Sequence, residues 1–410
     1  MNELLTKGIG HTEFKDSPVG KIPVGWEVKE LVQVGRCIRG LTYSPDNVVE
    51  NGLLVLRSSN VQDGRLLFED NVYVDLKVGD EYLSKNGDIL ICVRNGSRRL
   101  LGKSATITSN CPKSTHGAFM TVFRGELNFY VKHLMKSEMF FRQVSIDIGA
   151  TINSINNSNL LQFRFSFPSL PEQQKIASIL TSVDEVIEKT QSQINKLQDL
   201  KKGTMNELLT KGIGHTEFKD SPVGKIPVGW DIVELGSLCG FTQGVQIPLS
   251  DTLRKETDGY IRYLYINDFS SDKKLRFVRN EYSEKIVTTK DLVMANTGHT
   301  AGSVFRGKHG VLSNNAFKIS VNEKIIPEYL YYYLTTDDYW IQIGRLFNSA
   351  GQPHVGHGNI AKLNFLCPSI YEQSEVVNIL FSIEQNIEEK QRKLEQTQSL
   401  KKSLMQDLLT

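Results

Sequence analysis

The sequence lacks most of the signals that mark secreted, membrane-bound or metal-containing proteins. Its 410 residues include only five cysteines, Cys37, Cys92, Cys111, Cys239 and Cys367, which are widely spaced and form no CxxC pair. An odd number of scattered cysteines argues against a disulfide framework or a zinc site and favours small buried side chains. No run of about 18 apolar residues occurs, and the N-terminus has no basic segment followed by an apolar one. We therefore expect a protein of the cytoplasm without a membrane-spanning segment.

Sequence motifs of the common catalytic sites are also missing. There is no HExxH, no GxSxG and no Asn-Pro-Pro-Tyr segment of the kind that methylates the amino group of a flipped base. Residues 96–104 resemble a phosphate-binding loop, but five residues separate the glycines where that loop has four. A net charge of only +2 means that any surface for nucleic acid must be local. We expect no catalytic residue, no metal and no cofactor on this chain.

What the chain does contain is a long internal repeat. The stretch MNELLTKGIGHTEFKDSPVGKIPVGW at Met1 to Trp26 returns letter for letter at Met205 to Trp230, and the segment at Phe167 to Gln174 has a similar copy at Cys367 to Ser374. The protein therefore has two similar halves joined by a repeated connector. That connector is whole in the interior and split in its other copy between the C-terminus and the N-terminus. If both copies fold alike, the two chain ends meet in a pseudo-two-fold, circular arrangement.

Two variable segments lie between the connectors, and each is typical of a mixed α+β domain. Short β-branched and aromatic runs at 53–61, 87–93 and 117–123 recur in the same order at 260–266, 291–296 and 315–321. Each set is followed by an aromatic-rich stretch, at 129–144 and 327–343, that we expect to be helical. The predicted divisions are the N-terminal connector part at 1–26, a first domain at 27–165, a central connector with a long helix at 166–230, a second domain at 231–366 and a C-terminal helix at 367–410.

The first part of each connector predicts a long helix with a coiled-coil seam. Its apolar positions alternate in steps of four and three, which is the heptad pattern. The seam residues are Ile176, Leu180, Val183, Ile187, Ile194 and Leu197 in one helix, and Val376, Leu380, Ile383, Ile387, Leu394, Leu404 and Leu408 in the other. Polar residues interrupt both seams and are expected to fix one register.

We therefore predict two globular α+β domains at opposite ends of a long antiparallel two-helix coiled coil. Nearly 40 helical residues would span roughly 60 Å. The alternative, in which each helix only completes the core of its own domain, accounts less well for the heptads and leaves the split connector unexplained.

Polar and basic loops occur at similar places in the two variable segments. Arginine and lysine suit guanine edges and phosphates, whereas asparagine and glutamine suit adenine edges. The loops are therefore candidate DNA contacts, although such loops are more often plain solvated surface. The candidates are Arg94, Asn95, Ser97, Arg98, Arg99, Lys103, His116, Asn153 and Asn156 in the first segment, and Asn296, His299, Thr300, Arg306, Lys308, His309, Asn314, Gln352 and His354 in the second.

Taken together, these residues resemble the specificity subunit of type I restriction-modification systems over the whole chain. The resemblance is carried by KIPVGW before each variable segment, the Gly40 to Ser44 loop, the Gly87 to Leu90 strand, and the Glu-Gln pairs at 172–173 and 372–373 that open the long helices. It adds Thr42 and Tyr43 to the DNA candidates. It also points to Gln246 in the corresponding segment at 241–246, although that segment departs from the GxT form of the first loop and its role is less secure.

The resemblance implies two target recognition domains, each reading one half of an asymmetric, interrupted site in double-stranded DNA, with the helices fixing the spacer. It also implies two methyltransferase subunits docked on the conserved regions, and restriction-translocase subunits for cleavage. S-adenosylmethionine, ATP and Mg²⁺ would then belong to the partners. Two alternatives stay open at this point: a metal-dependent nuclease using Asp46, Asp75 and Lys77, and a coiled-coil adaptor with no role at DNA.

Overall fold

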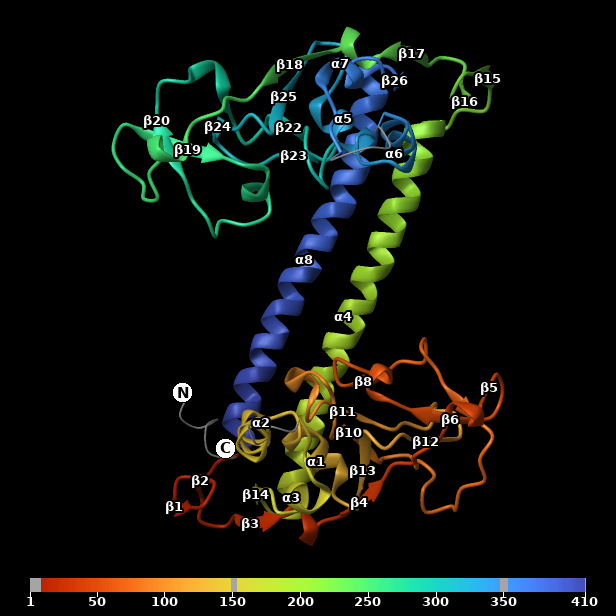
Figure 1. The fold of residues 1–410 in the computed structure, drawn as a ribbon, viewed down its shortest axis with the longest axis vertical. Helices are drawn as coiled ribbons and strands as arrows, with labels where there is room; N and C mark the ends of the chain where they lie inside the picture. The colour runs from red at the N-terminus through yellow and green to blue at the C-terminus, as the bar shows by residue number, and fades with distance from the viewer. Residues whose placement is uncertain (1–8, 149–152, 347–352, 410) are drawn as a thin grey trace. The chain divides into compact units, whose positions relative to one another are not determined.

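The computed structural model describes residues 9–148, 153–346 and 353–409, without the side chains of 406–409 (Figure 1). The chain forms two compact units. Unit 1 comprises Met1–Gln191 and Arg392–Thr410, and unit 2 comprises Ser192–Gln391. Both divisions fall inside the long helices α4 (Leu170–Lys211) and α8 (Ile370–Leu409), so each unit contains a globular part and a portion of each helix. None of the helices in the described part of the chain has the length and apolar character needed to span a bilayer.

The globular part of unit 1 is built on two four-stranded sheets, in the orders β11-β10-β13-β4 and β12-β6-β9-β5. The central strand β10 is buried along its whole length, which explains its unbroken apolar sequence ILIC. The sheet strands are β4 (Arg36–Arg39), β5 (Val48–Val49), β6 (Leu53–Leu56), β9 (Tyr73–Val74), β10 (Ile89–Cys92), β11 (Ser104–Thr106), β12 (Ser114–His116) and β13 (Met120–Arg124). Around them lie the strands β1 (Phe14–Ser17), β2 (Gly20–Pro23), β3 (Glu27–Glu30), β7 (Val61–Gln62), β8 (Arg65–Leu66) and β14 (Arg164–Phe167), and the helices α1 (Asn128–Leu134), α2 (Glu138–Asp147) and α3 (Asn157–Leu161).

Unit 2 repeats the first of these sheets strand for strand. Its order β18-β25-β22-β23 corresponds to β4-β13-β10-β11 of unit 1, whereas the second sheet, β20-β19-β24-β21, shares only the parallel pair at its centre. The sheet strands are β18 (Cys239–Gln243), β19 (Tyr260–Leu264), β20 (Phe277–Arg279), β21 (Ile286–Val287), β22 (Leu292–Ala295), β23 (Val304–Phe305), β24 (Gly310–Leu312) and β25 (Ala316–Val321). The remaining elements are β15 (Phe218–Ser221), β16 (Gly224–Pro227), β17 (Asp231–Glu234), β26 (Asn364–Cys367), α5 (Pro327–Tyr333), α6 (Asp337–Gly344) and α7 (His357–Ile360).

The predicted α+β class and strand order are confirmed, but each aromatic-rich stretch is two helices rather than one. Ser137 separates α1 from α2, and its hydroxyl oxygen accepts a hydrogen bond from the Phe140 backbone N–H at 3.3 Å. Thr336 does the same for Tyr339 between α5 and α6, at 3.2 Å. Both are ordinary N-cap residues followed by an acidic residue, and each starts a new helix in the middle of the apolar pattern.

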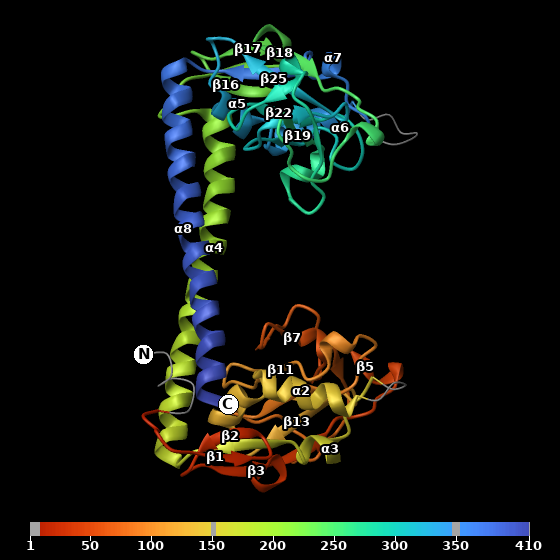
Figure 2. The same ribbon diagram turned by 90° about the vertical axis from the view of Figure 1, so that its left-hand side faces the viewer.

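Within each unit the two long helices pack antiparallel (Figures 1 and 2). In unit 1 the Lys401 Nζ lies 2.6 Å from Asp184 Oδ1, and in unit 2 the Lys201 Nζ lies 2.7 Å from Glu384 Oε1. These two ion pairs are equivalent in the repeat, because 184 and 384, like 201 and 401, differ by 200. One register therefore holds in both units.

The side chains of the predicted seam are largely shielded from solvent. Most of the seam side chains are buried and the others are half-buried, and the side chain of Leu408 lies outside the described residues. Two threonines among the polar seam residues, however, do not need partners on the other helix. Thr190 and Thr397 each donate a hydrogen bond to a carbonyl of their own helix, at Val186 and Lys393, both at 2.7 Å. Their hydroxyls are satisfied locally, so the ion pairs carry the register instead.

The two ends of the described chain meet inside unit 1. Ile9, Leu404 and Met405 belong to the same hydrophobic cluster, as the split connector predicts. The expected closure through Met1 to Trp26 can be followed from Ile9 onward. Residues 1–8 lie outside the described residues.

Candidate nucleic-acid interface

A carboxylate lock ties the repeated connector to the first turn of a long helix in unit 1. Glu172 Oε1 accepts a hydrogen bond from the Ile9 backbone N–H at 3.1 Å and lies 2.9 Å from His11 Nε2. Glu172 Oε2 accepts a hydrogen bond from Trp26 Nε1 at 3.1 Å. The Trp26 side chain is buried, so its indole N–H has to find an acceptor within the protein.

Unit 2 contains the same lock with the same atoms. Glu372 Oε1 accepts from the Ile213 backbone N–H at 2.9 Å and lies 2.8 Å from His215 Nε2, while Glu372 Oε2 accepts from Trp230 Nε1 at 2.9 Å. The letter-for-letter repeat of the connector therefore has a structural counterpart. In each copy a backbone N–H, a histidine and a tryptophan of the connector contact the glutamate in the first turn of a long helix. These contacts join the connector to that helix.

In unit 1, four loop segments meet at one end of the sheet β11-β10-β13-β4. The segment after β4 forms a parallel bridge with the turn before β13, between Leu41 and Gly117. The segment after β10 forms an antiparallel bridge with the segment before α3, between Arg94 and Ser154. We term these residues, 40–43, 94–95, 117–119 and 153–156, the first loop face.

The same four segments meet at the matching end of the sheet in unit 2. Val245 bridges Ser313 in parallel, and Thr297 bridges His354 antiparallel. We term residues 244–247, 297–299, 313–315 and 353–356 the second loop face. The bridges align Thr42 with Gln246, Arg94 with Thr297, Phe119 with Asn315 and Ser154 with His354. The two faces thus share a backbone and differ in side chains.

A glycine at the start of the first segment is required in both faces. A Cβ atom on Gly40 would lie 2.1 Å from the Gly117 carbonyl oxygen, and one on Gly244 would lie 2.0 Å from the Ser313 carbonyl oxygen. Both contacts are with backbone and cannot relax by side-chain rotation. The 241–246 segment, whose sequence departs from the GxT form, therefore occupies the same place as the Gly40 loop.

The loop faces gather ten of the residues predicted from the sequence: Thr42, Tyr43, Arg94, Asn95, Asn153, Asn156, Gln246, His299, Asn314 and His354. Arg98 borders the first face, where its Nε donates to Asn153 Oδ1 at 3.1 Å, and Ser97 adjoins it through a backbone hydrogen bond to Asn95 Oδ1 at 3.0 Å. Gln352 lies outside the described residues.

Two predicted residues are buried, and the prediction of a surface contact is wrong for both in this structure. His116 is 1% exposed, its Nε2 lies 2.9 Å from the Ile38 carbonyl oxygen, and burial lowers the pKa of its imidazole. Asn296 is 6% exposed and takes the place of Val93 at the end of its strand. Its Nδ2 donates to the Asn314 carbonyl at 3.2 Å, so it supports the second loop face from beneath.

Other predicted residues lie away from the loop faces. The Arg306 guanidinium lies 4.3 Å from the centroid of the Tyr331 ring and 3.8 Å from Glu384 Oε2 of α8. Lys308 Nζ lies 3.0 Å from Asp272 Oδ1. Both cations therefore contact other residues of unit 2. Thr300 and His309 lie in the same stretch of chain, outside the face.

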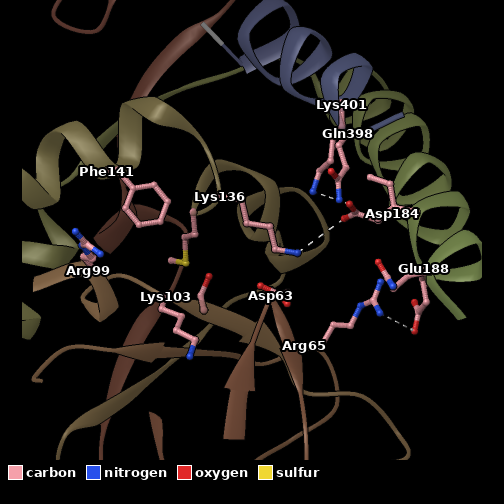
Figure 3. Close-up of a pocket in the computed structure, with 15 residues that line it drawn as sticks. Asp63, Arg65, Arg99, Lys103, Lys136, Phe141, Asp184, Glu188, Gln398 and Lys401 are labelled. Carbon is pink, nitrogen blue, oxygen red and sulfur yellow. Dashed lines mark ion pairs between the residues drawn. The ribbon is translucent and has the colours of Figure 1, made fainter. Parts of the chain in front are cut away.

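Arg99 and Lys103 line a cavity of about 690 Å³ between the globular part of unit 1 and its portion of the long helices (Figure 3). Asp184 of α4 lies at its edge and pairs with Lys401 of α8 and with Lys136, at 2.6 and 3.8 Å. Burial acts to raise the pKa of Asp184, but the hydrogen bond from Lys401 and the charge of Lys136 outweigh it and hold that pKa below its usual value. Asp184 is thus a charged junction between the two helices and the globular part.

Sequence reasoning missed Phe119, the large exposed apolar side chain of the first loop face. The apolar run at 117–123 predicts a strand that includes Phe119, whereas the strand β13 begins one residue later, at Met120. The available signal was the pair Asn314-Asn315 at the same distance before the matching strand of the second half.

The structure adds nothing in favour of a metal-dependent nuclease. In the described part of the chain, no three or more His, Cys, Asp or Glu side chains are grouped as a metal site would require. Asp46 and Asp75 are both exposed.

Comparison with known proteins gives a consistent result. The family model of the type I restriction modification DNA specificity domain matches the chain twice, over residues 23–199 and 227–397. A protein of Methanocaldococcus jannaschii provisionally named type I restriction enzyme MjaX specificity subunit is 29% identical over 97% of this chain and 96% of its own length. The type I restriction enzyme StySPI specificity subunit of Salmonella potsdam is 24% identical over 87% of this chain and 82% of its own length.

Solved structures share the fold at low sequence identity. The S subunit of a type I restriction-modification system from M. genitalium superposes with a TM-score of 0.61 at 14% identity, covering 94% of this chain and 96% of that one. A chain from a structure of type I system assembly and conformational transition gives a TM-score of 0.55, also at 14% identity, covering 93% and 97%. Since the family model covers most of the chain and the relatives match nearly all of it, the protein belongs to the DNA specificity subunits of type I restriction-modification systems.

Proposed function

We propose that each loop face reads one half of a bipartite, asymmetric site in double-stranded DNA. The observation that carries this proposal is the equivalence of the two faces: four bridged segments occur at matching positions, and the side chains at those positions differ. A shared backbone with different side chains is what two readers of different half-sites require. A scaffold without a role at DNA would have no reason to keep the loop geometry while changing the residues it presents.

The side chains on the faces suit contacts with DNA. Arg94 is exposed on the first face, and an arginine can bind guanine O6 and N7 or a phosphate. On the second face, Asn314 and Gln246 are hydrogen-bonded to each other at 3.3 Å, and such amides suit the edge of adenine. A hydrogen-bonded amide pair also holds the two groups in fixed orientation, which favours selection of one base.

The repeated parts of the chain are proposed to serve the other subunits of the system. Two methyltransferase subunits would dock on the connectors, whose locks are the same in both units, and restriction-translocase subunits would join them for cleavage. This chain would then be non-catalytic and act in the cytoplasm. S-adenosylmethionine, ATP and Mg²⁺ would bind to the partner subunits.

Half-site reading is tested by substituting one face at a time. Arg94→Ala, assembled with its methyltransferase subunits, is expected to change base preference in one half-site by about tenfold, since a specific base contact contributes roughly 1–3 kcal/mol. The measurement is methylation of duplexes with each half-site randomised separately. Arg36→Ala is the matched control, because Arg36 is exposed at the opposite end of β4. Equal changes in both half-sites would contradict the proposal.

The spacer is tested separately. Inserting four residues into α4 between Lys201 and Thr204 adds about 6 Å of helix, or roughly two base pairs. We expect the tolerated spacer to change and both half-site sequences to stay the same. An unchanged spacer in a folded, active complex would mean that the helices do not set the spacing.

A further inference from the structure

An aromatic ring stands exposed in the middle of the first loop face. The side chain of Phe119 is 57% exposed, which leaves much of an apolar ring in contact with water. Few side chains therefore pack against the ring, whereas the backbone of its turn is hydrogen-bonded to the neighbouring segment. The Phe119 carbonyl oxygen accepts hydrogen bonds from the backbone N–H groups of Val93 and Arg94, both at 3.0 Å, and the Met120 N–H donates to the Gly117 carbonyl at 2.9 Å. These hydrogen bonds hold the backbone of the turn on both sides of Phe119, and so fix where the side chain leaves the chain.

The surroundings of Phe119 are shaped to receive another molecule. A hollow of about 490 Å³ is lined by Phe119 together with Thr42 and Tyr43, and a second hollow of about 360 Å³ is lined by Arg94 and the segment before α3. Ala118 and Met120 line both, so this turn forms the ridge between them. The Arg94 guanidinium lies 5.9 Å from the centroid of the Phe119 ring. An apolar group and a cation thus stand side by side on the ridge.

The equivalent position of the second face carries an amide. Asn315 is exposed, and its carbonyl oxygen accepts from the Asn296 N–H at 3.0 Å, as the Phe119 carbonyl accepts from Val93. The turn is thus held by the same backbone bond in both units. The change from phenylalanine to asparagine leaves the frame intact and alters only what is presented. This is the behaviour of a position that selects a ligand and not of one that maintains the fold.

We propose that this position reads a base in each half-site, and that Phe119 contacts the 5-methyl group of a thymine while Asn315 pairs with an adenine. The chemistry follows from the major groove, where an apolar side chain can distinguish thymine by its methyl group and an amide can bind adenine N6 and N7. Arg94 beside the ring would hold an adjacent guanine or phosphate. This inference rests on the proposed function and adds the identity of the groups that are read.

The test removes the methyl group alone. In the complex with methyltransferase subunits, each thymine of the target is replaced in turn by deoxyuridine, and the dissociation constant of the duplex is measured. The chain is expected to lose about three- to fivefold in affinity at one thymine of one half-site, the effect of one buried methyl group. Phe119→Ala should bind the thymine duplex with the same loss and show no further change with deoxyuridine there.

Matched variants separate base reading from folding. Asn315→Ala should keep the full response to deoxyuridine in the first half-site. Asn315→Phe should shift the preferred base in the second half-site from adenine toward thymine. A Phe119→Ala variant that responds to every deoxyuridine as the original chain does would overturn the inference, while leaving half-site reading itself in place. Increased fluorescence of 2-aminopurine beside the site, lost in Phe119→Ala, would also overturn it, because the ring would then be a wedge between bases. If neither half-site selects any base, it is the proposed function that fails.

Discussion

The carboxylate locks offer a direct test of how the repeated connector is held. We consider Glu172→Gln in unit 1 and Glu372→Gln in unit 2, each alone. Glutamine keeps one oxygen for the backbone N–H and the histidine, but it turns an amide NH₂ toward the tryptophan N–H. In the folded chain the Trp230 N–H donates to a Glu372 carboxylate oxygen at 2.9 Å, whereas the Trp26 N–H donates to Glu172 at 3.1 Å and also lies 3.3 Å from His11 Nε2.

The size of the effect follows from burial. The glutamate side chains are 15% and 13% exposed, and both indoles are 1% exposed. A hydrogen bond to a charged group contributes roughly 1.5–3 kcal/mol, and a buried donor without an acceptor costs roughly 1–3 kcal/mol. We expect Glu372→Gln to lower the free energy of unfolding of unit 2 by about 2–3 kcal/mol. Glu172→Gln should lower that of unit 1 by less, because His11 Nε2 still lies 3.3 Å from the Trp26 indole N–H. Glu375→Gln is the matched control, because Glu375 is exposed on the next turn of α8.

Tryptophan fluorescence during urea unfolding provides the assay. The chain has three tryptophans, and Trp26 and Trp230 are the two that sit in the locks. In a Trp340→Phe background, Glu172→Gln should shift the transition reported by Trp26, and Glu372→Gln that reported by Trp230. If Glu372→Gln changes neither the fluorescence nor the unfolding of unit 2, the lock does not carry the junction and the reasoning is refuted.

The remaining predictions concern pH, the cavity and the loop glycines. Burial, followed by the charge of Lys132, lowers the pKa of His133 from 6.5 to about 3. The free energy of unfolding should therefore fall by at most ~1.4 kcal/mol per pH unit as the pH drops from 6.5 toward 3. His133→Gln should remove that slope in acid unfolding curves, and an unchanged slope would contradict the prediction. Arg99→Ala should leave half-site preference unchanged in methylation assays, because Arg99 lines the cavity beside the helices. Gly40→Ala should disrupt recognition of one half-site. Gly25→Ala should not, because a Cβ there meets no atom within 4 Å. An equal loss of recognition in both variants would show a general folding defect.

Much of the fold could be predicted from the chain because its patterns are local and strong. The heptads located the helix seam, and the apolar runs located β10, β13, β22 and β25. The apolar pattern could not show that one continuous stretch contains two helices, because the pattern runs on through the break between them. Ser137 and Thr336 break two amphipathic stretches by capping new helices, and each is followed by an acidic residue that could have been read as that signal.

The site was predicted in part, since residue type indicates chemistry but not direction. Arg98 and Arg99 are neighbours in the chain, yet one bonds to Asn153 of the first loop face and the other lines the cavity beside the helices. The sequence predicts a polar loop residue at Asn296, but in the structure this residue is buried at the position that a valine fills in unit 1. The lock at Glu172 joins residues more than 100 positions apart, and nothing in a single sequence pairs them.

The central claim, that the two loop faces read separate half-sites, is tested most directly at the equivalent positions Thr42 and Gln246. Thr42→Ala and Gln246→Ala are each assembled with the methyltransferase subunits, and the methylated products of a duplex library randomised across the whole site are sequenced. We predict that Thr42→Ala alters base preference in one half-site and Gln246→Ala in the other, with the spacer unchanged in both. Altered preference in the same half-site, or equally in both, would contradict the account.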